Sequence, residues 1–351
     1  HINIPGACIE QPVHDILIHP QKNDLILGTH GRGIWIFDKI AFLQEISPEL
    51  LGAEPYIFSI DSAMRFAAKP TRYGIGDREY RGQNPDYGAL ITYYLPEELS
   101  GDESIFLDIL NEQRDVIRTL HDIPRKQGLN RIAWGLLGEP PVKRENNGEE
   151  EDSIFNGIEG PQVLPGTYTA HLVVSDKVYE KPVKVILDPT LDVSMEDLEI
   201  QHQYAVKLRD MQSALNQGIQ ALNTLRDQIL DRKEAVRSQT ERFPETVLPS
   251  IEDSLAKLNQ IQDALIKPQD APFWSVGPRL IERVENLYNS IDSGNAPPTR
   301  AQMEYVNNLE DEYKSILDRL NGYFEETAPV LNEILTQNDV PSVLIPETIK
   351  F

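Results

Sequence analysis

Apolar and polar residues alternate along the first forty residues with the period of β-strands. The alternation covers Val13–His19, Asp24–Thr29 and Gly33–Phe37, and the joining stretches PQKN and HGRG are rich in turn residues. Joints this short are typical of hairpins, so the pattern predicts an antiparallel three-stranded meander. Its strands carry apolar residues on both sides, and three strands cannot cover two apolar faces by themselves. We therefore expect the meander to belong to a larger sheet assembly.

Short strands also dominate the stretch that follows residue 88. Turn residues punctuate this stretch and no helical period develops, which favours a β-sandwich. Residues 46–88 show no sustained period and are dense in Gly, Pro, Arg and Tyr toward their end, so a linker or loop is expected there. The expected strands are Ala89–Leu95, Ser104–Leu110, Asp115–Leu120, Asn130–Trp134, Gly166–Ser175 and Val178–Leu187.

The hydrophobic period changes to that of amphipathic helices at Ser194. Ser194 with Asp197 forms a variant capping box at the start of a long helix, and two further helices are expected over Ser250–Ile266 and Pro278–Ile291. A fourth begins after the sequence APPT, and Pro329 is expected to kink or end it. One apolar stripe per helix and short connections predict an antiparallel four-helix bundle.

Three short motifs resemble one protein family. The sequence VHDILIHPQKNDLILGTHGRGIWIFD resembles the closing blade of the bacterial sortilin-like, BNR-repeat (sialidase-like) β-propeller proteins. The pair GLNRIAWGL and VLPGTYTAHLVV resembles the immunoglobulin-like domain of the flagellar hook-capping type, which follows the propeller in that family. The segment PPTRAQMEYVNNLEDEY is similar to a segment near the family's C-terminus.

Together, the periodicity and the resemblance predict a multidomain α+β chain. Because His1 opens almost directly onto strand-like sequence without an initiator methionine, we expect a fragment or processed product whose upstream propeller blades lie elsewhere. The resemblance implies a secreted, periplasmic or cell-envelope location. The expected domains are a terminal β-propeller blade (1–45), a linker or loop (46–88), an immunoglobulin-like β-sandwich (89–190), the antiparallel four-helix bundle (194–340) and a C-terminal tail (341–351).

Composition restricts the classes of partner. The formal net charge of −23 makes nucleic acid and anionic membrane surfaces unsuitable partners, because both need a basic footprint. The single cysteine, Cys8, excludes an intrachain disulfide framework and a thiolate metal cage. No run of eighteen apolar residues exists, so no transmembrane segment is expected.

Motifs for nucleotide, metal or nucleophilic chemistry are absent, and no cofactor is predicted. The first candidate ligand site is the turn that carries His30 and Arg32 beside Trp35, which would offer a polar rim to an anionic or glycan ligand. In the alternative interpretation, the glycines of this turn meet unusual backbone angles while His30 and Arg32 tie neighbouring strands together.

A second candidate is the loop 72–87, in which aromatic and basic residues concentrate. Such a loop would clasp a peptide or sugar by stacking and cation–π contact, or it would pack the sandwich against the propeller. Its candidate ligand-binding residues are Arg72, Tyr73, Tyr80 and Arg81.

Carboxylates offer two further hypotheses. The acidic tract 145–152 would bind calcium or would be a solvated loop. Asp15, Asp24 and Asp38 are candidates for glycoside hydrolysis by residue type alone, whereas turn or strand-edge roles are commoner for aspartates in hairpins.

The sequence identifies no reaction. It favours a non-catalytic binding or scaffolding region that engages a protein or glycan ligand, a step that rests on analogy between folds. The alternative is the accessory region of a sialidase-like glycoside hydrolase whose active site lies on blades absent from this chain. Self-association through the helices is a third hypothesis.

Overall fold

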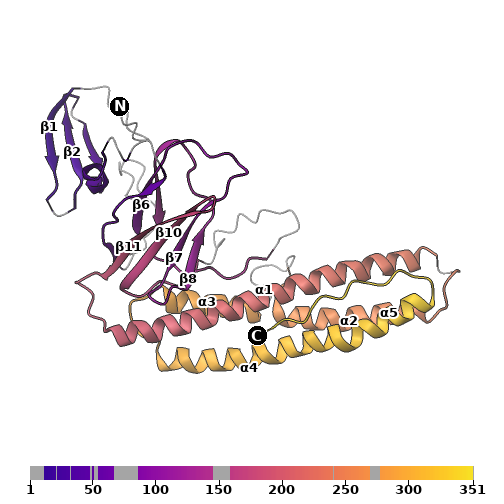
Figure 1. Ribbon diagram of the computed structural model, residues 1–351. Helices are drawn as coiled ribbons and strands as arrows, with labels where there is room; N and C mark the ends of the chain where they lie inside the picture. Colours follow the sequence, from indigo (N-terminus) through magenta and orange to yellow (C-terminus); the bar gives the residue numbers. More distant parts are fainter. Residues whose placement is uncertain are drawn as a thin grey trace. The chain divides into compact units, whose positions relative to one another are not determined.

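The chain is a mixed α+β protein that divides into two compact units (Figure 1). The computed structural model describes residues 12–20, 22–31, 33–47, 50, 54–66, 86–144, 159–239, 241–268 and 277–350. The strand unit comprises residues 1–139 and 162–192, and the helical unit comprises residues 140–161 and 193–351. Each unit is therefore built from two separate stretches of sequence. The predicted mixed α+β class is confirmed.

The predicted meander forms a three-stranded antiparallel sheet, which we call the apolar sheet. Its strands are β1 (Val13–Ile18), β2 (Leu25–Thr29) and β3 (Ile34–Phe37), in that order. The turn before β3 is closed by Thr29, whose backbone N–H and side-chain hydroxyl both donate to the carbonyl of Gly33, each at 2.9 Å. A short 3₁₀ helix, Ile40–Gln44, follows the sheet.

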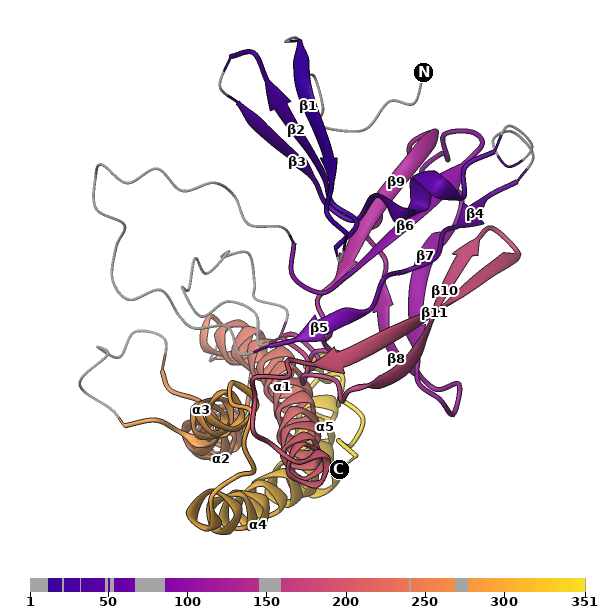
Figure 2. The ribbon, with the colours of Figure 1, turned by 90° about the vertical axis from the view of Figure 1, so that its left-hand side faces the viewer.

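Figure 2 shows the strands of two further sheets, and these two sheets share one apolar core. Strand alternation builds this core: along β6, Ile91, Tyr93 and Leu95 are each 0 % exposed, and partners from the other sheet meet them. The five-stranded sheet has the order β5 (Ala63–Arg65), β11 (Lys177–Leu187), β10 (Gly166–Val174), β7 (Ile105–Leu110), β8 (Val116–Leu120). The three-stranded sheet has the order β4 (Tyr56–Ile57), β6 (Ala89–Leu95), β9 (Gly128–Trp134).

The prediction of a linker throughout residues 46–88 is wrong for residues 54–66. This stretch contains β4 and β5, and Phe58 between them is 0 % exposed. Strands of two and three residues are too short to show a period. In addition, β5 pairs in parallel with β11, where Ala63 lies opposite Val185, and no local pattern reports a partner so distant in sequence.

Gly88, just before β6, allows the chain to approach the carboxyl end of β9 closely. Its φ is +114°, and a Cβ atom added there would lie 2.0 Å from the carbonyl oxygen of Trp134. Glycine tolerates both the positive φ and the close approach. The first pair of the β6–β9 ladder, Ala89 opposite Trp134, depends on this contact.

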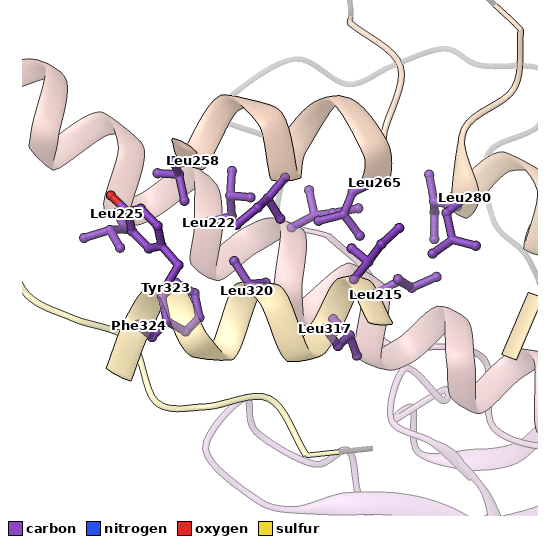
Figure 3. Close-up of a cluster of buried hydrophobic side chains, with 14 of the residues drawn as sticks. Leu215, Leu222, Leu225, Leu258, Leu265, Leu280, Leu317, Leu320, Tyr323 and Phe324 are labelled. Atoms are coloured by element: carbon purple, nitrogen blue, oxygen red, sulfur yellow. The ribbon is translucent and has the colours of Figure 1, made fainter. Parts of the chain in front are cut away.

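The described part of the helical unit contains five α-helices: α1 (Met195–Arg237), α2 (Val247–Leu265), α3 (Leu280–Asp292), α4 (Arg300–Gly322) and α5 (Ala328–Gln337). The predicted cap is confirmed, because the Asp197 N–H donates to Ser194 Oγ at 3.1 Å. Leucines from α1 to α4 meet with Tyr323 and Phe324 in one core (Figure 3). Such apolar stripes supply most of a helix's stability in water.

Pro329 does not end the last helix. A π-helical turn, Tyr323–Thr327, joins α4 to α5, and the Ala328 N–H donates to the carbonyl of Tyr323, five residues back. Proline has no N–H for the preceding turn and crowds the carbonyl four residues before it, and a widened turn relieves both problems. The chain therefore continues helically to Gln337.

Residues 340–350 form an extended segment that we call the strap. The expected tail over 341–351 thus differs from the structure, because Val343 is only 3 % exposed and belongs to the helical core together with Val340. Pro341 and Pro346 keep the strap out of helical conformation. In Figure 1 the strap runs back from the end of α5 along the helices.

Candidate functional site

The apolar sheet exposes large hydrophobic side chains. Exposed apolar area of this kind is uncommon on soluble proteins and marks a surface that another molecule or chain segment covers. Every residue of β1 is exposed, and so are the first three residues of β3. The exposed fractions are Val13 39 %, Ile16 65 %, Leu17 56 %, Ile18 51 %, Ile34 74 %, Trp35 39 % and Ile36 57 %.

Both faces of the apolar sheet carry such residues. Residues directly opposite each other in an antiparallel pair point to the same side, so the register assigns the faces. One face carries the exposed Ile16 and Trp35 on either side of Leu27, which is 8 % exposed. The other face carries the exposed Leu17 and Ile36 on either side of the half-buried Ile26. Among the residues that the structure describes, nothing buries β1 or β3 on either face.

Two of the predicted ligand-binding residues lie in this sheet or directly beside it. Trp35 lies on the face of Ile16, and His30 follows β2 directly. The His30 ring stacks on the His14 ring with 5.0 Å between centroids, and His30 Nδ1 lies 3.1 Å from His14 Nε2. This hydrogen bond requires that one of the two nitrogens carries no proton. His30 therefore ties two strands together, as the alternative interpretation of the turn proposed.

The other predicted binding residues, Arg32, Arg72, Tyr73, Tyr80 and Arg81, lie outside the described residues, as does the acidic tract 145–152. Of the three candidate carboxylates, Asp24 accepts a hydrogen bond from the Lys39 N–H at 2.9 Å and Asp15 accepts one from the Ile16 N–H at 3.0 Å. The Asp15 contact is local, and the Asp24 contact joins the chain just before β2 to the chain just after β3, so both carboxylates hold the strands that carry them.

Arg131 on β9 is a polar anchor that the sequence analysis did not single out. Its guanidinium donates to the carbonyls of Asp38 and Lys39 at 3.1 and 3.3 Å and to the Thr92 hydroxyl at 3.1 Å. It also lies over the Phe42 ring at 5.1 Å from the centroid, a cation–π contact. Arg131 lies within the motif GLNRIAWGL, at a half-buried strand position. An arginine at such a position is the sequence signal that could have identified this anchor.

Burial shapes the electrostatics around Arg131. Burial, followed by the nearby Asp24 carboxylate, raises the pKa of Asp38, while Arg131 opposes the shift. Burial lowers the pKa of Lys39. The adjoining cavity of about 120 Å³ is lined mainly by Phe37, Ile40, Phe42 and Leu129. Cavities that bind small molecules measure about 300–1,000 Å³, so this one is too small for a glycan.

The helical unit has a larger depression of about 650 Å³ between α1 and α4. Its rim is already ion-paired, because Lys207 and Lys314 both donate to the Glu310 carboxylate, at 2.5 and 2.9 Å. Their hydrogen bonds lower the pKa of Glu310. Burial, with Asp210 and Glu310 nearby, raises the pKa of Tyr313 to about 12, so its phenol stays protonated at neutral pH. The two lysines and the carboxylate on this rim are therefore occupied by one another.

No group of three or more potential metal-binding side chains occurs within the described part of the chain. Nor does any helix there combine the length and apolar character that crossing a membrane requires. Comparisons with protein-family models, with curated proteins and with solved structures gave no match to this chain. Among the described residues, the exposed apolar sheet is the feature that indicates binding.

Proposed function

We propose that the chain is a non-catalytic binding and scaffolding region whose apolar sheet is covered by further strands of a larger protein. The observation that carries this proposal is the exposure of apolar side chains on both faces of the sheet, including Ile16 and Ile36. Exposing two apolar faces to water is unfavourable, so such a sheet is expected to have both faces covered in the assembled protein. Stacked neighbours would provide that cover, as adjacent blades do in a propeller.

The proposal places the chain at the C-terminal end of a sortilin-like, BNR-repeat propeller protein. In it, the apolar sheet belongs to the closing blade, the two sheets that share a core form an immunoglobulin-like sandwich, and the helices form an antiparallel four-helix bundle. The motif resemblance and the order of elements along the chain support this assignment. A secreted, periplasmic or envelope location, with a protein or glycan ligand, goes with it by analogy.

The natural protein tests the proposal directly. Intact-mass and peptide-mapping analysis would show whether upstream chain accompanies residues 12–40, and radical footprinting would report the solvent access of Trp35, Ile16 and Ile36. We expect upstream chain to be present and these side chains to be modified at least about fivefold more slowly than in the isolated chain. Equal modification in both, or a natural product that begins near His1, would contradict the proposal.

In the isolated chain, replacing one apolar residue on each face should remove its tendency to associate without unfolding it. The variant Ile16→Lys with Leu17→Lys should lower the fluorescence of a bound hydrophobic dye at least about twofold and reduce aggregation. The strand unit's free energy of unfolding should change by only about 0.5 kcal/mol, since both side chains are exposed.

The matched control is Val178→Lys on β11, because Val178 is 49 % exposed and lies outside the apolar sheet. This control should leave the dye signal nearly unchanged. If it lowers the signal as much as the double variant does, the dye does not report the apolar sheet and the surface assignment is wrong.

A further inference from the structure

The strap is held by side chains of the helices. The described hydrogen bonds of residues 341–350 run to side chains of α1, α4 and α5. Three side-chain amides each hold one strap residue by both its N–H and its C=O. These pairs are Asn332 with Val343 (2.7 and 2.9 Å), Gln228 with Leu344 (2.7 and 3.3 Å) and Asn321 with Ile349 (2.8 and 2.9 Å).

An amide side chain offers a carbonyl oxygen that accepts and an NH₂ group that donates, and these match the N–H and the C=O of one extended residue. Because these bonds contact the strap's backbone, they depend little on its side chains. Selectivity comes instead from burial, since Val340 and Val343 are 4 % and 3 % exposed whereas Leu344 is 80 % exposed. We call Gln228, Asn321 and Asn332 the strap site.

The helical unit holds a second extended segment in the same way. The Val142 N–H donates to Ser213 Oγ at 3.2 Å, and Asn216 Nδ2 donates to the Val142 carbonyl at 2.7 Å. Two separate stretches of chain are thus bound on these helices through side-chain contacts to their backbones. Binding extended segments is therefore a repeated property of this unit.

The connection between α5 and the strap is short. Asp339 has φ +55°, in the left-handed region that aspartate adopts more readily than most residues, and the Val340 N–H turns back to the carbonyl of Leu335 at 2.9 Å. Short hinges favour exchange between copies of the segment that they carry.

We propose that the strap is exchangeable and that a second copy of this chain supplies its strap to the strap site, giving a dimer. The strap's own sequence fits this site, and a strap from another copy satisfies the same hydrogen bonds and buries the same valines. The entropy lost on association is therefore the main free-energy cost of exchange. The inference uses the helical unit alone and does not depend on the proposed function of the apolar sheet.

The test is a hinge-shortened full chain that lacks Asn338 and Asp339. It carries Ile16→Lys and Leu17→Lys so that association through the apolar sheet is removed. Without the hinge the strap cannot turn back onto its own helices, so we expect the dimer dissociation constant, measured by light scattering, to fall at least about tenfold relative to the same chain with the intact hinge. A synthetic peptide of residues 340–350 should return this dimer to monomer.

Two variants make the result specific. Asn321→Ala with Asn332→Ala should abolish dimerisation of the hinge-shortened chain, whereas Leu344→Ala, at the exposed strap position, should leave it intact. A hinge-shortened chain that keeps its helical circular dichroism but stays monomeric would overturn the proposal. So would a dimer that resists both the peptide and the paired asparagine variants.

If the shortened chain fails to fold, the unshortened chain still decides the matter. Two preparations carrying Ile16→Lys and Leu17→Lys and different affinity tags would be mixed, warmed and purified on one tag. We expect both tags to be recovered together, and recovery of the second tag to be lost when both copies carry the two asparagine substitutions. Recovery of a single tag in the starting pair would overturn the inference.

Discussion

Replacing Gly88 by alanine is expected to lower the strand unit's free energy of unfolding by about 4 kcal/mol, close to the largest effect of a single substitution. Two causes add. An alanine at φ +114° is strained, and its Cβ would lie 2.0 Å from the Trp134 carbonyl oxygen, a backbone atom that cannot rotate away. The β6–β9 ladder must open at Ala89 to relieve the overlap. Urea unfolding followed by tryptophan fluorescence, to which Trp134 contributes together with Trp35 and Trp274, measures the change.

Two other glycines separate these causes. Gly128 also has a positive φ, +96°, but an added Cβ meets nothing within 4 Å, so Gly128→Ala should show the backbone strain alone, about 1–2 kcal/mol. Gly101 has open space and no positive φ in the disfavoured range, so Gly101→Ala should be neutral or slightly stabilising. Equal effects at Gly88 and Gly128 would show that the close approach to Trp134 does not determine stability.

Replacing Glu285 by glutamine is expected to stabilise the helical unit at alkaline pH and to have little effect in acid. Burial on α3 raises the pKa of Glu285 from 4.5 to about 7; Glu282 adds to the rise and Arg144 opposes it. The folded state therefore holds this proton more tightly than the unfolded state. The contribution of this group to the free energy of unfolding is fully present below pH 4.5 and is lost as the pH rises through about 7.

At about pH 8 the ionised Glu285 destabilises the fold by about 3 kcal/mol, the free energy that corresponds to the pKa difference. The glutamine side chain in Glu285→Gln carries no charge, and its amide oxygen retains the acceptor that Gln212 Nε2 contacts at 3.2 Å. The variant should thus exceed the wild type by about 3 kcal/mol at pH 8 and match it near pH 4.5 in urea unfolding followed by far-ultraviolet circular dichroism. The control is Glu326→Gln, at an exposed position of the same unit, which should show no such pH-dependent gain. If the free energies of unfolding of Glu285→Gln and the wild type differed by the same amount at all pH values, the raised pKa of Glu285 would be contradicted.

Strong periodicity made most of the architecture predictable from the sequence. The expected strands of β6 to β11 and the four expected helices agree with the structure to within a few residues, because each carries a long apolar alternation or stripe. The short strands were not predicted, because β4 and β5 have only two and three residues and pair with strands that are distant in the sequence. The ordered strap was not predicted, because its prolines and polar residues are typical of a tail. Its conformation depends on hydrogen bonds with side-chain amides of the helices, which its own sequence does not show.

The candidate site was predictable in its apolar character and not in its contacts. Alternation showed that both faces of the meander are apolar, and the structure confirms that Ile16 and Ile36 are exposed. The contact of His30 with His14 depends on the β1–β2 register, which the pattern alone does not fix. Glu285 did leave a signal: it is four residues after Ile281 and three before Tyr288, within an apolar stripe.

The interleaving of the two units has a consequence for how the protein is made. The chain passes between units at residues 139/140, 161/162 and 192/193, so a single cut leaves the units covalently joined. During synthesis Val142 is made long before its partners Ser213 and Asn216. In the same way, β7 is made before its partner β10, because residues 140–161 of the helical unit lie between them in the sequence. Neither unit can be completed before the ribosome has passed the last stretch of the strand unit, and the first half of that unit must remain soluble with its central sheet unfinished until then.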